Sequence, residues 1–107
     1  MEKVVRDGKV AVLLSRGYGA GWGSWNYGVH EVIMFHPKIV QMVEDGREMD
    51  ITEEWLEKEL GLEGVYIYTG GREGLYIEWV PEGTKFRIDE YDGAERIITI
   101  DDLDMVA

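Results

Sequence analysis

The sequence predicts an α+β domain with a mostly antiparallel sheet of about five to six strands and two short helices on one face. Three observations lead to this prediction. Residues 9–15 form an apolar run with the composition of a buried strand. Two segments within residues 37–61 carry signals for the start and the end of a helix. From residue 65 onward, short β-type segments alternate with glycine and proline turns, which is typical of antiparallel strands.

Length and composition limit the class of protein. The chain has 107 residues, a common size for one domain, so we expect a single α+β domain over residues 1–107. Hydrophobic residues make up 45% of the chain, which is enough for a core, and the absence of cysteine excludes disulfides and cysteine-based metal sites. The longest apolar run near the N-terminus is only Val10–Leu14, so we expect neither a signal peptide nor a membrane span, and a cytoplasmic location.

The first strand is predicted over Lys9–Ser15, because a near-continuous apolar run suits a strand that is covered on both faces. It leads into a segment that we call the glycine-aromatic loop, residues 16–28, in which glycine and large aromatic residues alternate. Val29–Phe35 then returns to β-type composition.

Two helices are predicted next. Pro37–Asp45 begins with a proline, which suits the first helical position, and Gly46 follows at its end. The second helix begins after Thr52, whose hydroxyl can accept a hydrogen bond from a first-turn amide, and it ends at Gly61. The buried stripes of the two helices are expected to be Ile39, Val40 and Val43, and Trp55, Leu56 and Leu60.

The C-terminal part predicts a four-strand antiparallel meander. A type I turn is expected at Val80–Gly83, which has proline second and glycine fourth, and Asp92-Gly93 is a strong hairpin signal. One capped turn is expected over Asp101–Met105. The four predicted strands are Val65–Thr69, Leu75–Val80, Lys85–Tyr91 and Glu95–Ile100.

The net charge of −11 is unevenly distributed along the chain. Residues 1–43 hold five basic side chains against three acidic ones, so the excess of acid lies in residues 44–107. Two interpretations stay open: a solvated acidic surface that keeps the protein soluble, or an acidic face for a basic partner. Direct nucleic-acid binding is not expected, because phosphate contacts need clustered lysine and arginine.

The glycine-aromatic loop is the candidate binding surface. Glycine is costly to order and an aromatic ring in water loses its burial energy, so a segment that combines both is expected to form a shaped surface. The alternative is that two or three of the rings belong to the core. The candidate binding residues are Arg16, Tyr18, Trp22, Trp25 and Tyr27.

Phosphate-binding motifs are missing from this loop. The glycine spacing of a dinucleotide fingerprint fails at Gly17 and at Gly19, and the Gly-Lys-Ser/Thr of a P-loop is absent. A looser nest of backbone N–H groups around an anion, with Arg16 beside it, stays open. With Trp22 or Trp25 stacking on a base, this arrangement would suit a small nucleotide-like ligand.

Catalytic, metal and cofactor sites are not predicted. His30 and His36 do not have the spacing of metal ligands, and no EF-hand pattern is present. A serine hydrolase would need Ser15 or Ser24 beside a histidine, but no nucleophile elbow surrounds either serine. We therefore expect a protein that is not an enzyme.

Three segments resemble small proteins that recur in tailed-phage genomes and have no assigned function. They are Val10-Ala-Val-Leu-Leu-Ser-Arg-Gly-Tyr-Gly-Ala-Gly-Trp22, Tyr66-Ile-Tyr-Thr-Gly-Gly71, and Glu78-Trp-Val-Pro-Glu-Gly-Thr-Lys-Phe-Arg-Ile-Asp-Glu-Tyr-Asp-Gly93. The resemblance implies a phage or prophage origin and a location in the cytoplasm of the bacterial host. It implies no activity and no catalytic residues.

The sequence therefore predicts a non-enzymatic binding protein of phage origin that uses the glycine-aromatic loop and an acidic surface. Its expected partner is a host protein, and inhibition of a host defence system is the most specific form of this hypothesis. The alternative is a binder or sponge for a small nucleotide-type ligand. Formation of a homo-oligomer, including pairing of edge strands between copies, stays open.

Overall fold

A computed structural model describes residues 2–17 and 19–99, and within them it shows an α+β fold with antiparallel sheets. Tyr18, Ile100 and the turn predicted over Asp101–Met105 lie outside the described residues. The strands are β1 (Val5–Arg6), β2 (Lys9–Ser15), β3 (Leu75–Pro81), β4 (Phe86–Tyr91) and β5 (Ala94–Thr99). The helices are α1 (His30–Phe35), α2 (Pro37–Glu44) and α3 (Glu53–Leu60), with short 3₁₀ turns η1 (Gly23–Trp25), η2 (Glu48–Asp50) and η3 (Gly70–Gly74).

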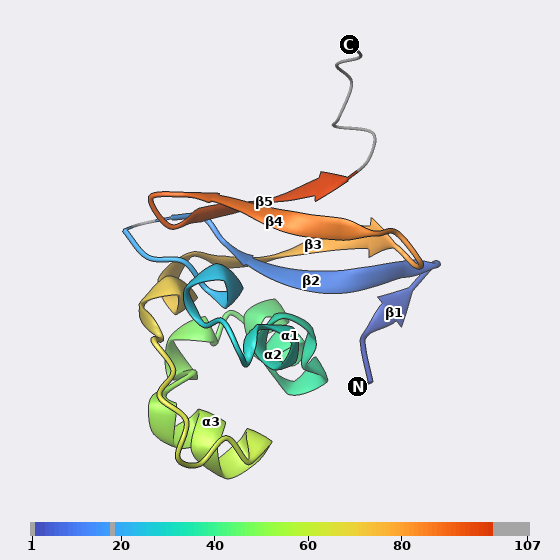
Figure 1. Ribbon diagram of the computed structural model, residues 1–107. Helices are drawn as coiled ribbons and strands as arrows, with labels where there is room; N and C mark the ends of the chain where they lie inside the picture. Colours follow the sequence, from blue (N-terminus) through green and yellow to red (C-terminus); the bar gives the residue numbers. More distant parts are fainter. Residues whose placement is uncertain (1, 18, 100–107) are drawn as a thin grey trace.

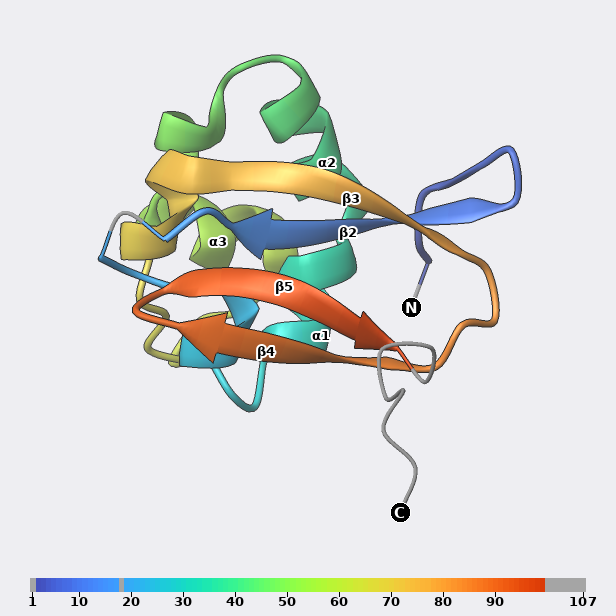
Figure 2. The same ribbon diagram turned by 90° about the horizontal axis from the view of Figure 1, so that it is seen from above.

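The strands form two antiparallel sheets. β2 pairs with β3 along its whole length and with β1 at its start, while β4 pairs with β5. In space the β4–β5 hairpin lies beside β2, and an isolated bridge between Arg16 and Ala94 joins the two sheets (Figures 1 and 2). α2 and α3 pack on one face of β2, and α1 packs with the hairpin against the other face. The single sheet that was expected is divided into a three-stranded and a two-stranded part.

The predicted first strand is confirmed, and it is the centre of the fold. Ala11 and Leu13 pack in one hydrophobic cluster with side chains of α2 and α3. Val12 and Leu14 pack in a second cluster with α1 and the β4–β5 hairpin. All four side chains are fully buried, as an apolar run without alternation predicts.

Both predicted helices are confirmed, and the structure adds a third. In α3 the Thr52 hydroxyl accepts a hydrogen bond from the Trp55 N–H at 3.1 Å, and Gly61 ends the helix in the left-handed conformation. The β-type composition of Val29–Phe35 was misleading, because residues 30–35 form α1. In the helical conformation Ile33 reaches the first hydrophobic cluster and Phe35 the second, so tertiary packing outweighs the strand propensity.

The four-strand meander is wrong in two respects. Val65–Thr69 is not a strand, because the backbone of Tyr68 is bound by the side chain of Asn26 and not by a neighbouring strand. β3 pairs with β2 and not with β4. The turn after β3 is also one residue later than expected: Thr84 N–H donates to Pro81 O at 3.1 Å, and Gly83 takes the third position with φ +87°, as a type II turn requires.

The hairpin at Asp92-Gly93 is confirmed. Both residues have positive φ, 51° and 87°, which is the combination of a type I′ turn. The turn sets the register of β4 against β5, with Tyr91 opposite Ala94. Phe86 and Ile88 then point into the second hydrophobic cluster, as their alternation with charged residues predicts.

Candidate functional site

The glycine-aromatic loop is anchored by a buried carboxylate, Glu95 of β5, whose residue is only 4% exposed. One carboxylate oxygen accepts the Ser15 N–H at 2.9 Å. The other accepts the N–H groups of Trp22 and Ser24, each at 2.9 Å, and also the Ser24 hydroxyl. The end of β2 and the middle of the loop are thereby fastened to β5.

This arrangement is a nest of backbone N–H groups around an anion, and the anion belongs to the protein itself. A nest was one of the possibilities that the sequence left open, with a phosphate as its ligand. In the structure the Glu95 carboxylate occupies it, so its N–H groups are not available to an external anion.

Close backbone contacts also hold the loop. A Cβ atom added at Gly71 would lie 2.2 Å from the Gly21 carbonyl oxygen, a distance that only glycine permits. A Cβ atom at Gly93 would lie 2.5 Å from the Ala20 backbone. The turns before β3 and β5 can therefore lie directly against the loop, which explains why glycine stands at these two turn positions.

The expectation that Trp22 is a binding residue is wrong. Its side chain is 0% exposed, and its indole N–H donates to the Ile33 carbonyl oxygen at 2.8 Å. The ring packs in the first hydrophobic cluster and has no surface to offer a ligand. Trp22 is therefore a core residue that fixes the loop over α1.

The other expected residues are placed differently. Trp25 is 41% exposed and Tyr27 is 91% exposed, so both present their rings to solvent. The Arg16 guanidinium lies 4.5 Å from the centre of the Tyr76 ring, and Arg16 lines neither of the two depressions described below. Tyr18 lies outside the described residues.

Asn26 brings a second aromatic segment beside the loop. Its side-chain oxygen accepts the Tyr68 N–H at 2.8 Å, and its side-chain NH₂ donates to the Tyr68 and Trp22 carbonyl oxygens at 2.9 and 2.8 Å. The buried Asn26 amide therefore bonds to the backbone of the loop, at Trp22, and to the backbone of residues 65–69, at Tyr68. In this way Asn26 links the two segments. The Trp25 and Tyr68 rings then stack with their centres 5.6 Å apart.

The result is a contiguous exposed surface around a shallow depression of about 380 Å³. We call it the aromatic patch, and it consists of Trp25, Tyr27, Val65, Tyr66 and Tyr68. Sequence reasoning did not include the last three residues, because residues 65–69 were assigned to a strand. The available signal was the aromatic pair Tyr66 and Tyr68 in a short segment with a glycine shortly before it and two glycines after it.

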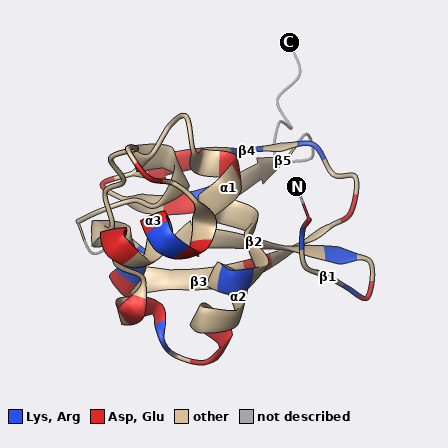
Figure 3. Ribbon diagram, turned by 90° about the horizontal axis from the view of Figure 1, so that it is seen from below, with Lys and Arg blue, Asp and Glu red and all other residues tan. Residues whose placement is uncertain are grey.

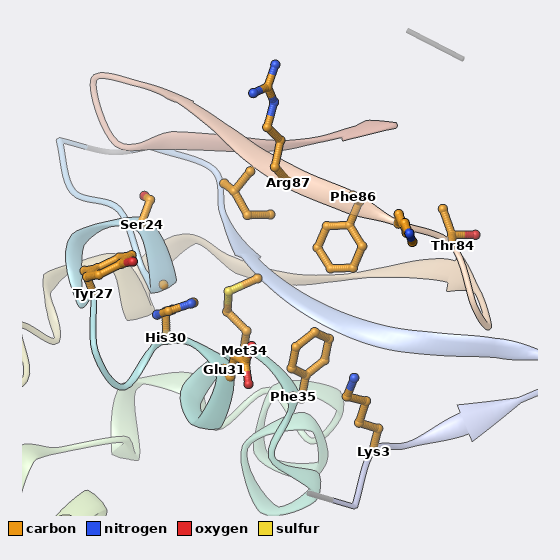
Figure 4. A pocket seen from close by; sticks show the side chains of 13 residues that line it. Lys3, Ser24, Tyr27, His30, Glu31, Met34, Phe35, Thr84, Phe86 and Arg87 are labelled. Carbon is orange, nitrogen blue, oxygen red and sulfur yellow. The ribbon is translucent and has the colours of Figure 1, made fainter. Parts of the chain in front are cut away.

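A second hollow, the α1–β4 groove, has a volume of about 800 Å³ (Figure 4). Met34 and Phe35 of α1 point towards Phe86 of β4 and form its apolar floor. Tyr27 stacks on His30 at one end, and the Lys3 ammonium lies over the Phe35 ring at the other. The side chain of Arg87 points away from the groove.

The residues that a hydrolase would use are engaged elsewhere. The Ser24 hydroxyl donates to Glu95, and the Ser15 hydroxyl donates to the Ala20 carbonyl oxygen at 2.8 Å. His30 accepts the Gly28 N–H, and His36 accepts the Lys38 N–H at the start of α2. Within residues 2–17 and 19–99, no three metal-ligating side chains gather at one place.

The charges are dispersed on the surface of the described residues. Figure 3 shows acidic residues on α3 and on connecting segments, with basic residues between them. In the same part of the chain, no helix combines the length and apolar character needed to cross a membrane. Comparison with family models, curated proteins and solved structures finds none that matches this chain.

Proposed function

We propose that the protein is a non-enzymatic binding protein that recognises a partner protein through the aromatic patch. The observation that carries this proposal is the exposure of Trp25, Tyr27 and Tyr66 around one depression. Tryptophan and tyrosine provide most of the binding energy in many protein interfaces, because they bury a large rigid area and keep a polar tip. Contiguous apolar patches on a soluble surface commonly mark such interfaces.

The anchoring of the patch supports the same proposal. Glu95 and Asn26 fix the backbone beneath the rings through buried hydrogen bonds. A patch held in this way loses little conformational entropy when a partner binds, which favours affinity.

The acidic character of the chain indicates the kind of partner. With a net charge of −11, the protein attracts a surface that surrounds its apolar contact with basic residues. The resemblance to small tailed-phage proteins extends the proposal to a host protein in the bacterial cytoplasm, with a component of a defence system as the most specific candidate.

A nucleotide-type ligand is the alternative, and it has less support. Glu95 occupies the N–H nest, and the Arg16 guanidinium lies over Tyr76. The indole N–H of Trp25 donates to the Glu90 carboxylate at 3.1 Å, so a base stacked there would bring its phosphate towards a negative charge. Thermal-shift titration with nucleotides tests this alternative, which predicts a rise in Tm that is lost in Trp25→Ala.

The proposal is tested by removing two exposed rings, Tyr27→Ala with Tyr66→Ala, and by using the protein as bait in a bacterial lysate. Tyr91→Ala is the matched control, because Tyr91 is an equally exposed ring on β4 outside the patch. We expect the wild type and the control to retain the same partner and the double variant to lose it, with unchanged Tm. Retention of that partner by the double variant would overturn the proposal, as would recovery of no partner at low and at physiological salt.

A further inference from the structure

Within the described part of the chain, the outer edge of β4 has no neighbouring strand. β4 pairs with β5 on one side, and among the described residues no strand pairs with its other side. Figure 2 shows β4 as the outermost strand of the hairpin, with β5 between it and β2. An exposed edge of this kind presents backbone groups that can pair with another chain.

The register identifies those backbone groups. In a two-residue hairpin the pair that flanks the turn, here Tyr91 and Ala94, exchanges hydrogen bonds, and bonded and non-bonded pairs then alternate. Phe86, Ile88 and Glu90 therefore direct their N–H and C=O groups to the outer edge. None of these backbone groups has a hydrogen-bond partner within the described part of the chain.

The order of side chains on β4 is self-complementary in charge. Two antiparallel copies of β4 centred on Ile88 place Arg87 of each copy opposite Asp89 of the other. Ile88 then faces Ile88, Phe86 faces Glu90, and all of the outward-directed backbone groups are paired. Opposite charges directly across a strand pair are stabilising.

We propose that two copies of this chain associate through the outer edges of β4, antiparallel and centred on Ile88. The two hairpins then form one four-stranded sheet about a twofold axis. Such an interface is the same surface on both copies, which is what closed dimers require.

The neighbouring registers do not share this complementarity. The next two registers that use the same backbone groups are centred on Arg87 and on Asp89. They place two guanidinium groups or two carboxylates directly opposite each other, which is destabilising. The register centred on Arg87 gains Lys85 opposite Asp89 but keeps its two guanidinium groups face to face. Of these three registers, only the one centred on Ile88 therefore has no like charges opposite each other.

Charge reversal tests the proposal by sedimentation equilibrium at about 0.15 M salt, where long-range repulsion between two acidic copies is largely screened. We expect the wild type to reach twice the monomer mass of 12.3 kDa. Arg87→Asp and Asp89→Arg each place like charges opposite, so each should weaken homodimerisation at least about tenfold. Both side chains are exposed, and the ion pair with Arg96 that Asp89→Arg removes is an exposed one of small energy, so the fold should persist, as circular dichroism can verify.

An equimolar mixture of Arg87→Asp and Asp89→Arg is the decisive sample. Both cross-strand pairs of the heterodimer are again opposite in charge, so the mixture should dimerise about as tightly as the wild type. Lys58→Asp and Glu63→Arg make the same changes in net charge at exposed positions away from β4 and should leave dimerisation unchanged.

Hydrogen exchange tests the use of the β4 edge without any variant. With increasing protein concentration, exchange should slow at the amides of Phe86, Ile88 and Glu90. A monomeric wild type would overturn the proposal, and so would a dimer that tolerates both charge reversals, such as one held by the aromatic patch. Mixed variants that bind no more tightly than either variant alone would also contradict it.

Discussion

Glu95 is a single residue on which the shape of the glycine-aromatic loop depends. Its carboxylate is buried, and among the described residues no lysine or arginine forms an ion pair with it. Backbone N–H groups and the Ser24 hydroxyl provide its hydrogen bonds instead. A buried charge is tolerated when hydrogen bonds replace its hydration, and here the same bonds order the loop.

We predict that Glu95→Ala lowers the free energy of unfolding by about 3 kcal/mol or more, because it leaves the buried N–H groups of Ser15 and Trp22 without an acceptor. Glu95→Gln keeps one oxygen and should lose less. Urea denaturation measures both changes. Glu82→Ala, which removes an exposed carboxylate in the turn after β3, is the control, and an equal loss in that variant would contradict the prediction.

The two tryptophans of the loop should contribute differently to the stability of the fold. Trp22→Ala empties a core site and removes the hydrogen bond to Ile33, so the free energy of unfolding should fall by about 3–5 kcal/mol. Trp25→Ala removes a ring that is partly in solvent and should cost clearly less stability. Urea denaturation of both variants checks this difference, and equal losses would place Trp25 in the core as well.

At the scale of elements, the sequence predicts correctly the helices and turns whose signals lie within a few neighbouring residues. The start and end of α3 depend on Thr52 and Gly61, and the β4–β5 hairpin depends on the Asp92-Gly93 turn. α1 and residues 65–69 were misassigned because distant contacts decide them. In residues 65–69 the partner of the backbone is the Asn26 side chain, which lies about forty positions away and leaves no periodic pattern.

The same distinction applies to the candidate site. The sequence identified the loop and the exposed rings Trp25 and Tyr27, but it could not assign Trp22 to the core. Tyr66 joins the patch only because Asn26 holds its segment beside the loop. Alternation of glycine and aromatic residues indicates an unusual surface, whereas the burial of each ring depends on tertiary contacts.

α2 contains a pH-sensitive cap. The His36 side chain accepts the Lys38 N–H at 3.1 Å, which requires an unprotonated ring nitrogen. Partial burial lowers the pKa of His36 below its ordinary value of 6.5, and the nearby Lys38 lowers it further, while Glu2 acts in the opposite direction. Folding therefore favours the neutral ring.

We predict that this contribution to stability is fully present above about pH 6.5 and is lost as the pH falls through the lowered pKa of folded His36. The free energy of unfolding, measured by urea denaturation between about pH 7 and pH 5, should decrease on acidification. His36→Asn supplies a cap that does not titrate in this range and should flatten the profile. An unchanged profile in this variant would show that His36 is not responsible.

For the whole molecule, β2 is the element that connects the two proposed binding surfaces. The two faces of β2 contribute to separate hydrophobic clusters, one with α2 and α3 and one with α1 and the hairpin. The loop that follows β2 is therefore attached to the best-buried strand of the fold. The aromatic patch and the β4 edge both lie on elements that pack against this strand or its loop.

The net charge of −11 should make stability depend on salt. Repulsion among carboxylates is stronger in the folded than in the unfolded chain, and salt screens it. The exposed ion pairs, such as Arg96 with Asp89, weaken in salt too, but each contributes under about 1 kcal/mol. We therefore predict that raising sodium chloride to about 0.15 M increases the Tm by several degrees.

A variant with less negative charge is the control for this prediction. Glu63→Gln, Glu73→Gln and Glu82→Gln together remove three of the 22 carboxylates at exposed positions. Because repulsion grows with net charge, calorimetry should show a smaller salt-dependent rise in Tm for this variant. A decrease in Tm with salt, or an equal rise in both proteins, would mean that the acidic surface does not oppose folding, and its excess charge would then act only on solubility and on partners.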